Sequence, residues 1–187
     1  EGTLGIAEEL AQRQLLAVTP ALFFRGDTGP CSFDGHDKER AFARMRSYDR
    51  VQGLRDLWDV VRWMRAELDQ GGRSHITAHG ICFGGHLAAH LAHEDAVDAL
   101  STVHGGRLEL VSGQHSLKVP ASLHFGDQDS AIPLSHVEQV RSNWPQAEVI
   151  IHRGASHGFA HPGSPVFMPD AYQQSFERLV QLSLPEL

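Results

Sequence analysis

The chain of 187 residues carries 23 acidic and 16 basic side chains, a formal net charge of −7 at pH 7. With no basic run and no basic helix face, it is not expected to bind nucleic acid or an anionic membrane surface. No apolar stretch reaches the roughly 18 residues needed to span a bilayer, and no signal-peptide pattern opens the chain, so we expect a cytoplasmic protein. The length predicts a single domain over residues 1–187, with one core.

The two cysteines, Cys31 and Cys82, are interpreted as free thiols, because a single pair in a domain of this size does not form a scaffold of bridges. Cys31 falls in a loop and is interpreted as a bystander. The 13 histidines make the net charge sensitive to pH between about 5 and 8, so metal binding has to be considered.

The first predicted elements in chain order are a helix over Glu1–Gln14 and two apolar segments, Leu15–Val18 and Ala21–Arg25. The helix has apolar residues near a 3.6-residue period. Leu15–Val18 is predicted to be a short buried strand that stops before Pro20, and Ala21–Arg25 runs out into a loop. Gly26–Asp37 is rich in Gly, Asp, Ser and Pro and lacks periodicity, which predicts a surface loop and the best candidate for a lid.

The rest of the chain alternates between helical and strand patterns. The predicted helices are Asp49–Leu68, Phe83–His93, Pro133–Trp144 and Ala171–Leu182, and the predicted strands are His75–His79, Ala96–Val103, Ala121–Phe125 and Ala147–His152. Such alternation is typical of an α/β fold, a mostly parallel sheet with helices on both faces in a three-layer sandwich. In these sheets the functional residues lie on loops at the carboxyl ends of the strands.

The stretch Thr77–His86 reads as a strand, a tight turn and a helix, with Cys82 at the tip of the turn. A sharp elbow strains its central residue, and Gly80 and Gly84, two residues to either side, lack the Cβ atoms that would collide. The helix N-terminus favours a thiolate at Cys82, and the N–H of Phe83 is a candidate oxyanion donor. The alternative is a glycine-rich turn that holds an inert, buried cysteine.

A thiol nucleophile needs a base, and the base needs a third group that fixes its tautomer. His157 lies in a Gly-flanked turn after a predicted strand, and Asp129 follows another. The chain order Cys82, Asp129, His157 is the nucleophile, acid, histidine order of an α/β-hydrolase sheet. Asp127 competes with Asp129 for the role of the acid, and either carboxylate could instead cap the helix that begins near Pro133.

Three blocks of the sequence resemble the active-site blocks of the dienelactone hydrolases, or carboxymethylenebutenolidases. They are Gly80–Gly85, the Gly126-x-x-Asp129 segment that leads to Ile132-Pro133, and Ala155–Phe159. The resemblance implies an α/β-hydrolase fold and a cysteine-dependent hydrolase of small esters or lactones that works through an acyl-enzyme. By position, it implies that Cys82 is the nucleophile, His157 the base and then the acid, and Asp129 its orienting partner.

The resemblance also indicates departures. The family has strands and a loop before its first helix that supply a second oxyanion N–H and a glutamate, so we expect an N-terminal segment to be missing here. Family members that act on dienelactone hold its carboxylate with arginines, one shortly after the histidine, where this chain has His161. Arg25, Lys38 and Arg40 are possible anion contacts. Phe83, Arg25 and Phe159 are the candidate oxyanion and substrate-binding residues.

Two rival functions follow from other features. His86, His90 and His93 have helical i, i+4, i+7 spacing, a ladder that could hold zinc or nickel. A hydrolase fold without catalysis, acting as a binding module, is the other alternative. We expect no cofactor and no metal, a small-molecule ester or lactone as the partner, and a monomer or homodimer.

Overall fold

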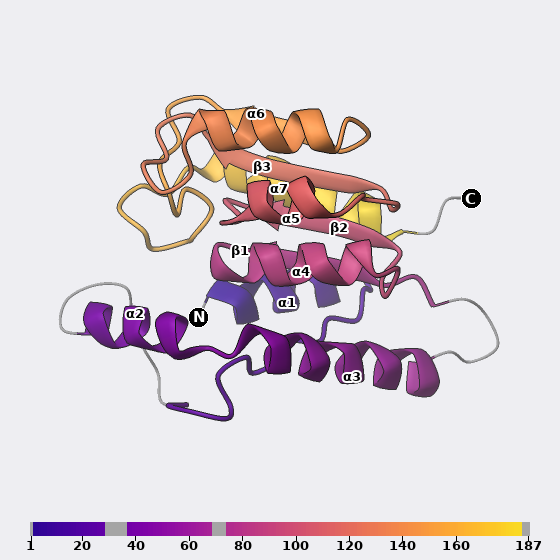
Figure 1. Cartoon of the computed structure of the whole chain (residues 1–187). Coiled ribbons are helices and arrows are strands. Elements are labelled where there is room, and N and C mark those ends of the chain that lie inside the picture. The colour runs from indigo at the N-terminus through magenta and orange to yellow at the C-terminus, as the bar shows by residue number, and fades with distance from the viewer. Residues whose placement is uncertain (1, 29–36, 69–73, 185–187) are drawn as a thin grey trace.

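The computed structural model describes residues 2–28, 37–68 and 74–184. Its four strands form one parallel sheet, in which each strand pairs with the next one along the chain (Figure 1). They are β1 Thr77–Ile81, β2 Ala99–Val103, β3 Ala121–Gly126 and β4 Glu148–His152. Because all four run in the same direction, their carboxyl ends meet at one edge of the sheet.

Helices cover both faces of this sheet (Figure 1). They are α1 Gly2–Gln12, α2 Lys38–Ser47, α3 Arg50–Leu68, α4 Phe83–His93, α5 Leu108–Gln114, α6 Leu134–Asn143 and α7 Pro169–Ser183. The helices α4, α5 and α6 share a core with one face, and α3 packs against α4 from outside. The helices α1 and α7 pack together against the other face. The predicted α/β sandwich is confirmed.

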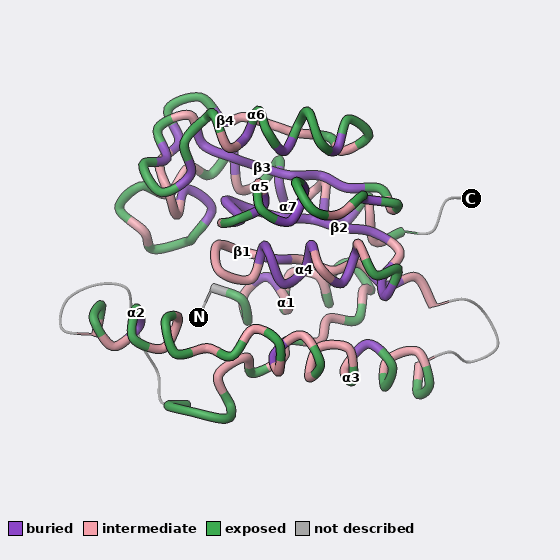
Figure 2. The backbone as a smooth tube through the Cα atoms, in the orientation of Figure 1, coloured by how far each residue is buried: buried purple, intermediate pink, exposed green. Residues whose placement is uncertain are grey.

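Successive residues of a strand point to opposite sides of the sheet, so its two faces carry different side chains. The α4 face is mainly apolar, and the α7 face carries histidines. Leu100 and Leu123 lie on the α4 face, are fully buried and contribute to the largest apolar cluster. The tube of Figure 2 shows β2 and β3 buried along their lengths. Both strands are buried because the parallel sheet is covered on both sides, although they carry polar residues such as Ser101 and His124.

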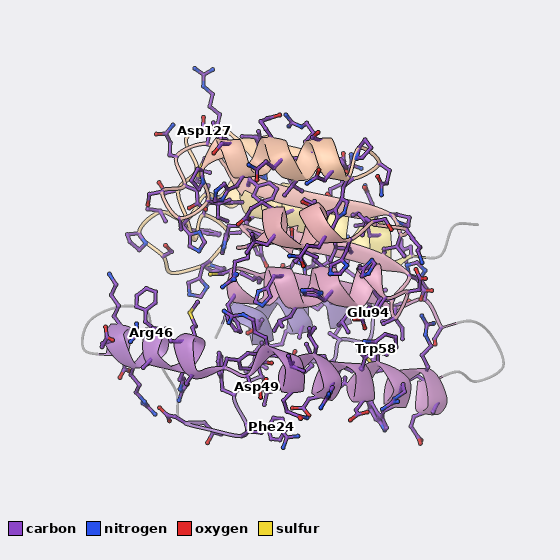
Figure 3. All side chains as sticks on the ribbon, viewed as in Figure 1. Phe24, Arg46, Asp49, Trp58, Glu94 and Asp127 are labelled. Atoms are coloured by element: carbon purple, nitrogen blue, oxygen red, sulfur yellow. The ribbon has the colours of Figure 1, made fainter. Side chains whose placement is uncertain are left out.

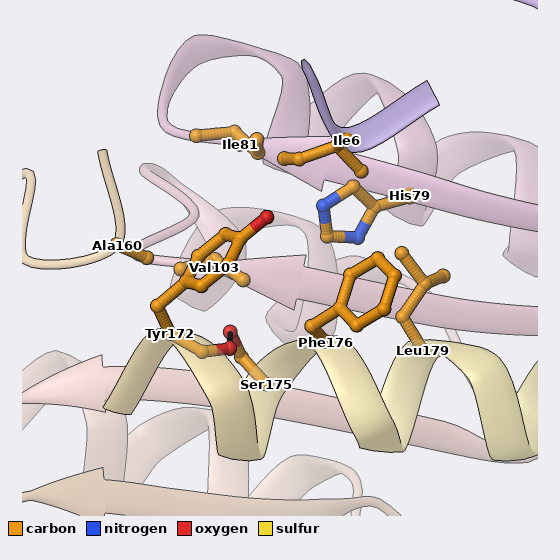
Figure 4. Close-up of a pocket in the computed structure, with 9 residues that line it drawn as sticks. All are labelled: Ile6, His79, Ile81, Val103, Ala160, Tyr172, Ser175, Phe176 and Leu179. Atoms are coloured by element: carbon orange, nitrogen blue, oxygen red, sulfur yellow. Dashed lines mark hydrogen bonds between the residues drawn. The ribbon is translucent and has the colours of Figure 1, made fainter. Parts of the chain in front are cut away.

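Histidine side chains occupy the α7 face, where His124 is fully buried and His79 is partly buried. His79 of β1 bonds through Nδ1 to the hydroxyl of Ser101, at 3.0 Å, and its ring lies close to Ile6 and Phe176 in a small pocket between α1 and α7 (Figure 4). His124 of β3 bonds to the ring of His152, also at 3.0 Å. Burial lowers the pKa of His79 to about 4 and that of His124 to about 3, so both rings are neutral near pH 7.

Polar contacts anchor the helix α3 to the end of α4 and to the segments before β1 and β2. Trp58 of α3 donates from its indole nitrogen to Glu94, directly after α4 (Figure 3). Arg65 binds the carboxylate of Asp98 at 2.8 Å, and Asp98 in turn accepts from the backbone N–H of Ile76, just before β1. Neither α3 nor any other helix in the described residues is long and apolar enough to cross a membrane.

The prediction of a strand over Leu15–Val18 is wrong: this described segment belongs to no sheet. Leu16 is 67% exposed, whereas Leu15 packs beside the α1–α7 cluster, so the short apolar run reflects one anchoring side chain and not a buried strand. Ala21–Arg25 forms a turn. The candidate lid falls mostly on residues 29–36, which with Cys31 lie outside the described residues.

Two helices were not predicted. The helix α2 buries only Ala41, so it lacks the apolar stripe by which an amphipathic helix is recognised. The helix α5 has seven residues, too few for a periodic pattern to stand out.

Candidate active site

The predicted elbow joins β1 to α4. Cys82 has φ 49° and ψ −113°, a backbone conformation that residues with a Cβ rarely adopt, and α4 begins at the next residue. A Cβ on Gly80 would lie 2.5 Å from the carbonyl oxygen of Gly84, so only glycine fits there. The prediction that Gly84 has to be a glycine is wrong, because a Cβ there would meet nothing within 4 Å. The glycine required after the elbow is Gly85, where a Cβ would lie 2.5 Å from Cα of Gly105.

The N–H of Phe83 is available at the tip of the elbow. Phe83 is the first residue of α4, and the first N–H groups of a helix have no acceptor within it. The carbonyl of Cys82 is held by two backbone donors, Gly85 N at 3.0 Å and Gly106 N at 3.1 Å. This fixes the elbow against the loop after β2, and the ring of Phe83 packs edge-on against Tyr48 with centroids 5.1 Å apart.

His157, from the loop after β4, connects a thiol to a carboxylate. Its Nε2 is 3.1 Å from the sulfur of Cys82, and its Nδ1 is 2.7 Å from Oδ2 of Asp129. The other carboxylate oxygen of Asp129 accepts from the backbone N–H groups of Ala131, at 2.8 Å, and Ile132, at 3.1 Å. The Asp129 side chain is 1% exposed and that of His157 is 31% exposed, so the carboxylate is sealed while the imidazole is accessible.

Asp127 lies in the same loop but serves another purpose. Its carboxylate accepts from the backbone N–H of Gly154 at 2.6 Å, which ties the loop after β3 to the turn after β4. A second tie is the bond from Gln128 N to the carbonyl of Ala155, at 2.9 Å. A Cβ on Gly126 would lie 2.1 Å from that same carbonyl, so a glycine is required for the two loops to approach. Of the two carboxylates, Asp129 is the one beside the imidazole.

The charges of the three groups are coupled. The hydrogen bond with Asp129, and then that with the Cys82 sulfur, raise the pKa of His157 to about 10, against the opposing effect of burial. Burial alone would raise the pKa of Asp129, but the His157 hydrogen bond and charge and the two backbone N–H groups outweigh it and lower that pKa. An imidazolium between a carboxylate and a sulfur is therefore the favoured state near neutral pH.

One residue beside this cluster was not predicted. His104 follows β2, has φ 37° and is 3% exposed. Its ring lies against that of His157, with centroids 4.6 Å apart, and neither of its nitrogens has a hydrogen-bond partner. Burial, and next the charge of His157, lower the pKa of His104 to about 3. The available signal was its position at the carboxyl end of a strand, directly before Gly105-Gly106.

Two predicted substrate contacts lie elsewhere. Arg25 binds Asp56 of α3 through two hydrogen bonds, at 2.9 and 2.7 Å, and stacks on Phe24, and none of its described contacts reaches the cysteine. Phe159 has no exposed surface and packs beneath His104, with ring centroids 5.5 Å apart. Phe159 therefore packs against His104 and is not exposed to a substrate. Arg40, another possible anion contact, forms an ion pair with Asp27.

The histidine ladder on α4 does not converge on one point. His86 is buried and accepts from Nε of Arg50 at 3.2 Å, while His93 stacks on His115 with centroids 4.1 Å apart. Across residues 2–28, 37–68 and 74–184, the one group of three His, Cys or acidic ligands within reach of a single ion is Cys82, His104 and His157.

A family model for the dienelactone hydrolase family matches residues 2–184, nearly the whole chain. The chain belongs to this family. The resemblance drawn from the three sequence blocks is thereby confirmed, and the dienelactone hydrolase family is one of hydrolases that act on carboxylic ester and lactone bonds.

Comparisons with individual proteins agree with this membership. A carboxymethylenebutenolidase of Pseudomonas putida is 26% identical over 182 residues, which cover 94% of this chain and 76% of the relative. The crystal structure of a Klebsiella pneumoniae protein assigned to the dienelactone hydrolases superposes with a TM-score of 0.81 at 23% identity, over 97% of this chain and 80% of that one. Esterase 2 of Thermogutta terrifontis superposes with a TM-score of 0.58 at 20% identity, over 69% of this chain and 61% of that one. At these identities the two structures show the shared fold alone.

Proposed function

We propose that this dienelactone hydrolase family member is a cysteine-dependent hydrolase of small carboxylic esters or lactones. The observation that carries the proposal is the 3.1 Å separation between the Cys82 sulfur and Nε2 of His157, whose other nitrogen is bound to Asp129. A nucleophile, a base and an orienting acid at hydrogen-bond distances are the arrangement that acyl transfer requires.

In the acylation step, the Cys82 thiolate attacks the carbonyl carbon of the ester. Collapse of the tetrahedral intermediate breaks the bond to the alkoxy oxygen, which takes the proton from Nε2 of His157. Asp129 holds the imidazole ring in place and stabilises its positive charge before that transfer. The N–H of Phe83, free at the start of α4, supports the developing oxyanion.

In the deacylation step, water attacks the thioester carbonyl. The now neutral His157 accepts a proton from the water, the bond to sulfur breaks, and the acid product leaves with the thiolate–imidazolium pair restored. For a lactone, both products of cleavage are one hydroxy acid or its tautomer, because the leaving oxygen stays tethered to the acyl group.

The residues at two of the expected contacts for a substrate carboxylate favour neutral substrates over anionic ones. The resemblance implies an arginine shortly after the catalytic histidine for binding a substrate carboxylate, and this chain has His161 there. Arg25 is already bound to Asp56. We therefore propose small neutral esters and lactones as the substrate class, ahead of dienelactone.

The test is hydrolysis of p-nitrophenyl acetate and of dienelactone by the full chain, beside the Cys82→Ala variant. We expect turnover of the neutral ester by the parent and loss of activity in the variant. Intact-mass measurement during turnover should detect one acetyl group on the parent and none on Cys82→Ala. Equal rates in the two proteins would refute the role of Cys82. Folded parent protein that cleaves neither compound nor other small esters would favour the alternative of a binding module.

A further inference from the structure

The unpartnered ring of His104 needs an explanation that the hydrolytic mechanism does not supply. Its residue is 3% exposed, and neither Nδ1 nor Nε2 has a hydrogen-bond partner. Buried polar groups without partners are few in folded proteins, and they often mark a functional contact or an ion. The proposed acyl transfer uses Cys82, Asp129 and His157 and gives His104 no step.

The position of His104 suggests what it contacts. One ligand atom each from Cys82, His104 and His157 lie within 4.8 Å of one another. They come from the ends of β1, β2 and β4, so the parallel sheet brings them to one edge. A thiolate and two imidazoles are the donor types that zinc and related soft transition metals prefer.

We propose that Cys82, His104 and His157 form a binding site for one transition-metal cation of the zinc class, which reversibly blocks the active site. Three protein ligands with a fourth position open to solvent are typical of accessible zinc sites. The binding itself is independent of turnover, while the block rests on the proposed hydrolase function. In the bound state, the nucleophile and the base are both occupied as ligands.

The surroundings of His157 fit this second role. Metal-binding histidines commonly donate their other N–H to a carboxylate, and Nδ1 of His157 is 2.7 Å from Asp129. Tetrahedral zinc places sulfur and nitrogen ligands about 3.5 Å apart, and the three ligand atoms already lie within 4.8 Å of one another, so modest side-chain movement would complete the site. The 3.1 Å separation between Cys82 and His157 already lies near this value.

The protons and charges of the binding step balance without a redox reaction. The proton held between the Cys82 sulfur and Nε2 of His157 passes to solvent when the ion binds. The thiolate and the two imidazoles each supply a lone pair, and the metal keeps its oxidation state. Chelation restores the thiolate–imidazolium pair.

The experiment titrates the metal-free full chain with Zn²⁺ by calorimetry and measures alkylation of Cys82 by iodoacetamide with and without the ion, with the modified peptide identified by mass spectrometry. We expect one saturable equivalent and a rate of alkylation at least about tenfold lower with zinc. In a parallel titration, Co²⁺ should give the thiolate-to-metal charge-transfer absorption of a cysteine ligand.

The decisive variant is His104→Phe, which keeps a ring in the buried position and removes both nitrogens. Loss of this ligand should weaken zinc binding at least about tenfold, on the scale seen when support of a metal site is removed. Each variant is compared with itself, as the ratio of its alkylation rates without and with zinc. The matched control is His115→Ala, which breaks the surface histidine cluster with His90 and His93 and should leave zinc affinity unchanged.

Three results would overturn the site: no saturable equivalent of zinc on the parent, undiminished protection of Cys82 in His104→Phe, or loss of affinity in His115→Ala in place of His104→Phe. If His104→Phe does not fold, the absence of the Co²⁺ charge-transfer band in the parent decides against the proposal and its presence supports it. If ester hydrolysis depends on Cys82 but its rate is unchanged by zinc, the proposed block of the active site is refuted and the proposed hydrolase function is not. If the parent binds zinc but the Cys82→Ala variant keeps full hydrolytic activity, the proposed function is refuted and the metal site is not.

Discussion

Gly85 and Gly105 are in backbone contact, and a Cβ added to Gly85 would lie 2.5 Å from Cα of Gly105. This contact brings the first turn of α4 against the loop after β2, which carries His104 on one side and donates Gly106 N–H to the carbonyl of Cys82 on the other. The elbow therefore depends on a close approach between two loops as well as on its own strained residue.

A methyl group at Gly85 should consequently be destabilising, whereas one at Gly84 should be tolerated. We expect Gly85→Ala to lower the free energy of unfolding by about 1–3 kcal/mol or more, because backbone atoms have to move. Gly84→Ala should be neutral or stabilising by up to about 1 kcal/mol, since its Cβ meets nothing and alanine favours helix. Urea denaturation of the two variants measures the difference, and equal losses of stability would contradict a role for the contact between Gly85 and Gly105.

Replacement of Asp129 should affect catalysis far more than replacement of Asp127. Asp129→Asn replaces the acceptor beside His157 with an amide, and we expect kcat/KM for p-nitrophenyl acetate to fall roughly 10²–10⁴-fold, the range for general acid–base assistance. Asp127→Asn keeps an oxygen that accepts from Gly154 N and should change kcat/KM less than about threefold. A larger loss of kcat/KM in Asp127→Asn than in Asp129→Asn would show that Asp127 is the carboxylate that orients His157.

The rate should depend on pH through the raised pKa of His157. Hydrogen bonds to Asp129 and Cys82 raise that pKa to about 10, so the imidazolium that protonates the leaving group persists through neutral pH and is lost as the pH rises through about 10. We expect kcat/KM to show no loss near pH 6.5 and to fall on the alkaline side. In Asp129→Asn the alkaline limb should move to lower pH. A parent limb near pH 6.5 would instead indicate a neutral histidine that acts as the base.

The histidines of the α7 face should make the fold sensitive to acid. The pKa of His79 is lowered to about 4 by burial, so between pH 6.5 and 4 the unfolded chain binds a proton that the folded chain does not. The free energy of unfolding therefore falls as the pH drops through this window, by up to about 1.4 kcal/mol per pH unit for each such histidine. His124, whose pKa is about 3 for the same reason, adds to this slope.

Urea denaturation at several pH values between 7.5 and 4.5 measures the slope. The variant His79→Asn keeps a polar partner for Ser101 and removes the titrating ring. The slope of its free energy of unfolding against pH should therefore be smaller by the contribution of one proton, up to about 1.4 kcal/mol per pH unit. An unchanged slope would show that His79 is not the source.

The sequence was most informative where several local signals agreed. The predicted helix Phe83–His93 is α4, and the predicted strands lie within three residues of β1–β4 at either end, since each of these short segments ends at or close to a glycine. Leu15–Val18 was misjudged because apolar composition says nothing about whether a hydrogen-bonding partner strand is available.

Within the site, the positions after strand ends indicated which loops would meet, but not which way side chains would point. Asp127 and Asp129 both follow β3, and only the bonds to Gly154 and His157 separate them. His104 was missed because its position after a strand did not by itself set it apart, and its lack of hydrogen-bond partners is a property of the packed structure. The roles of Cys82 and the other site residues stay proposals that the variants above test.

The sequential strand order also has a consequence for synthesis of the protein on the ribosome. Cys82 precedes His157 by 75 residues, and the loop that carries His157 follows β4, which is made after β1, β2 and β3. A nascent chain that ends before β4 therefore exposes a thiol that lacks the His157 imidazole. The thiol acquires this partner only when β4 docks on β3 and brings the loop with His157 to the same edge of the sheet.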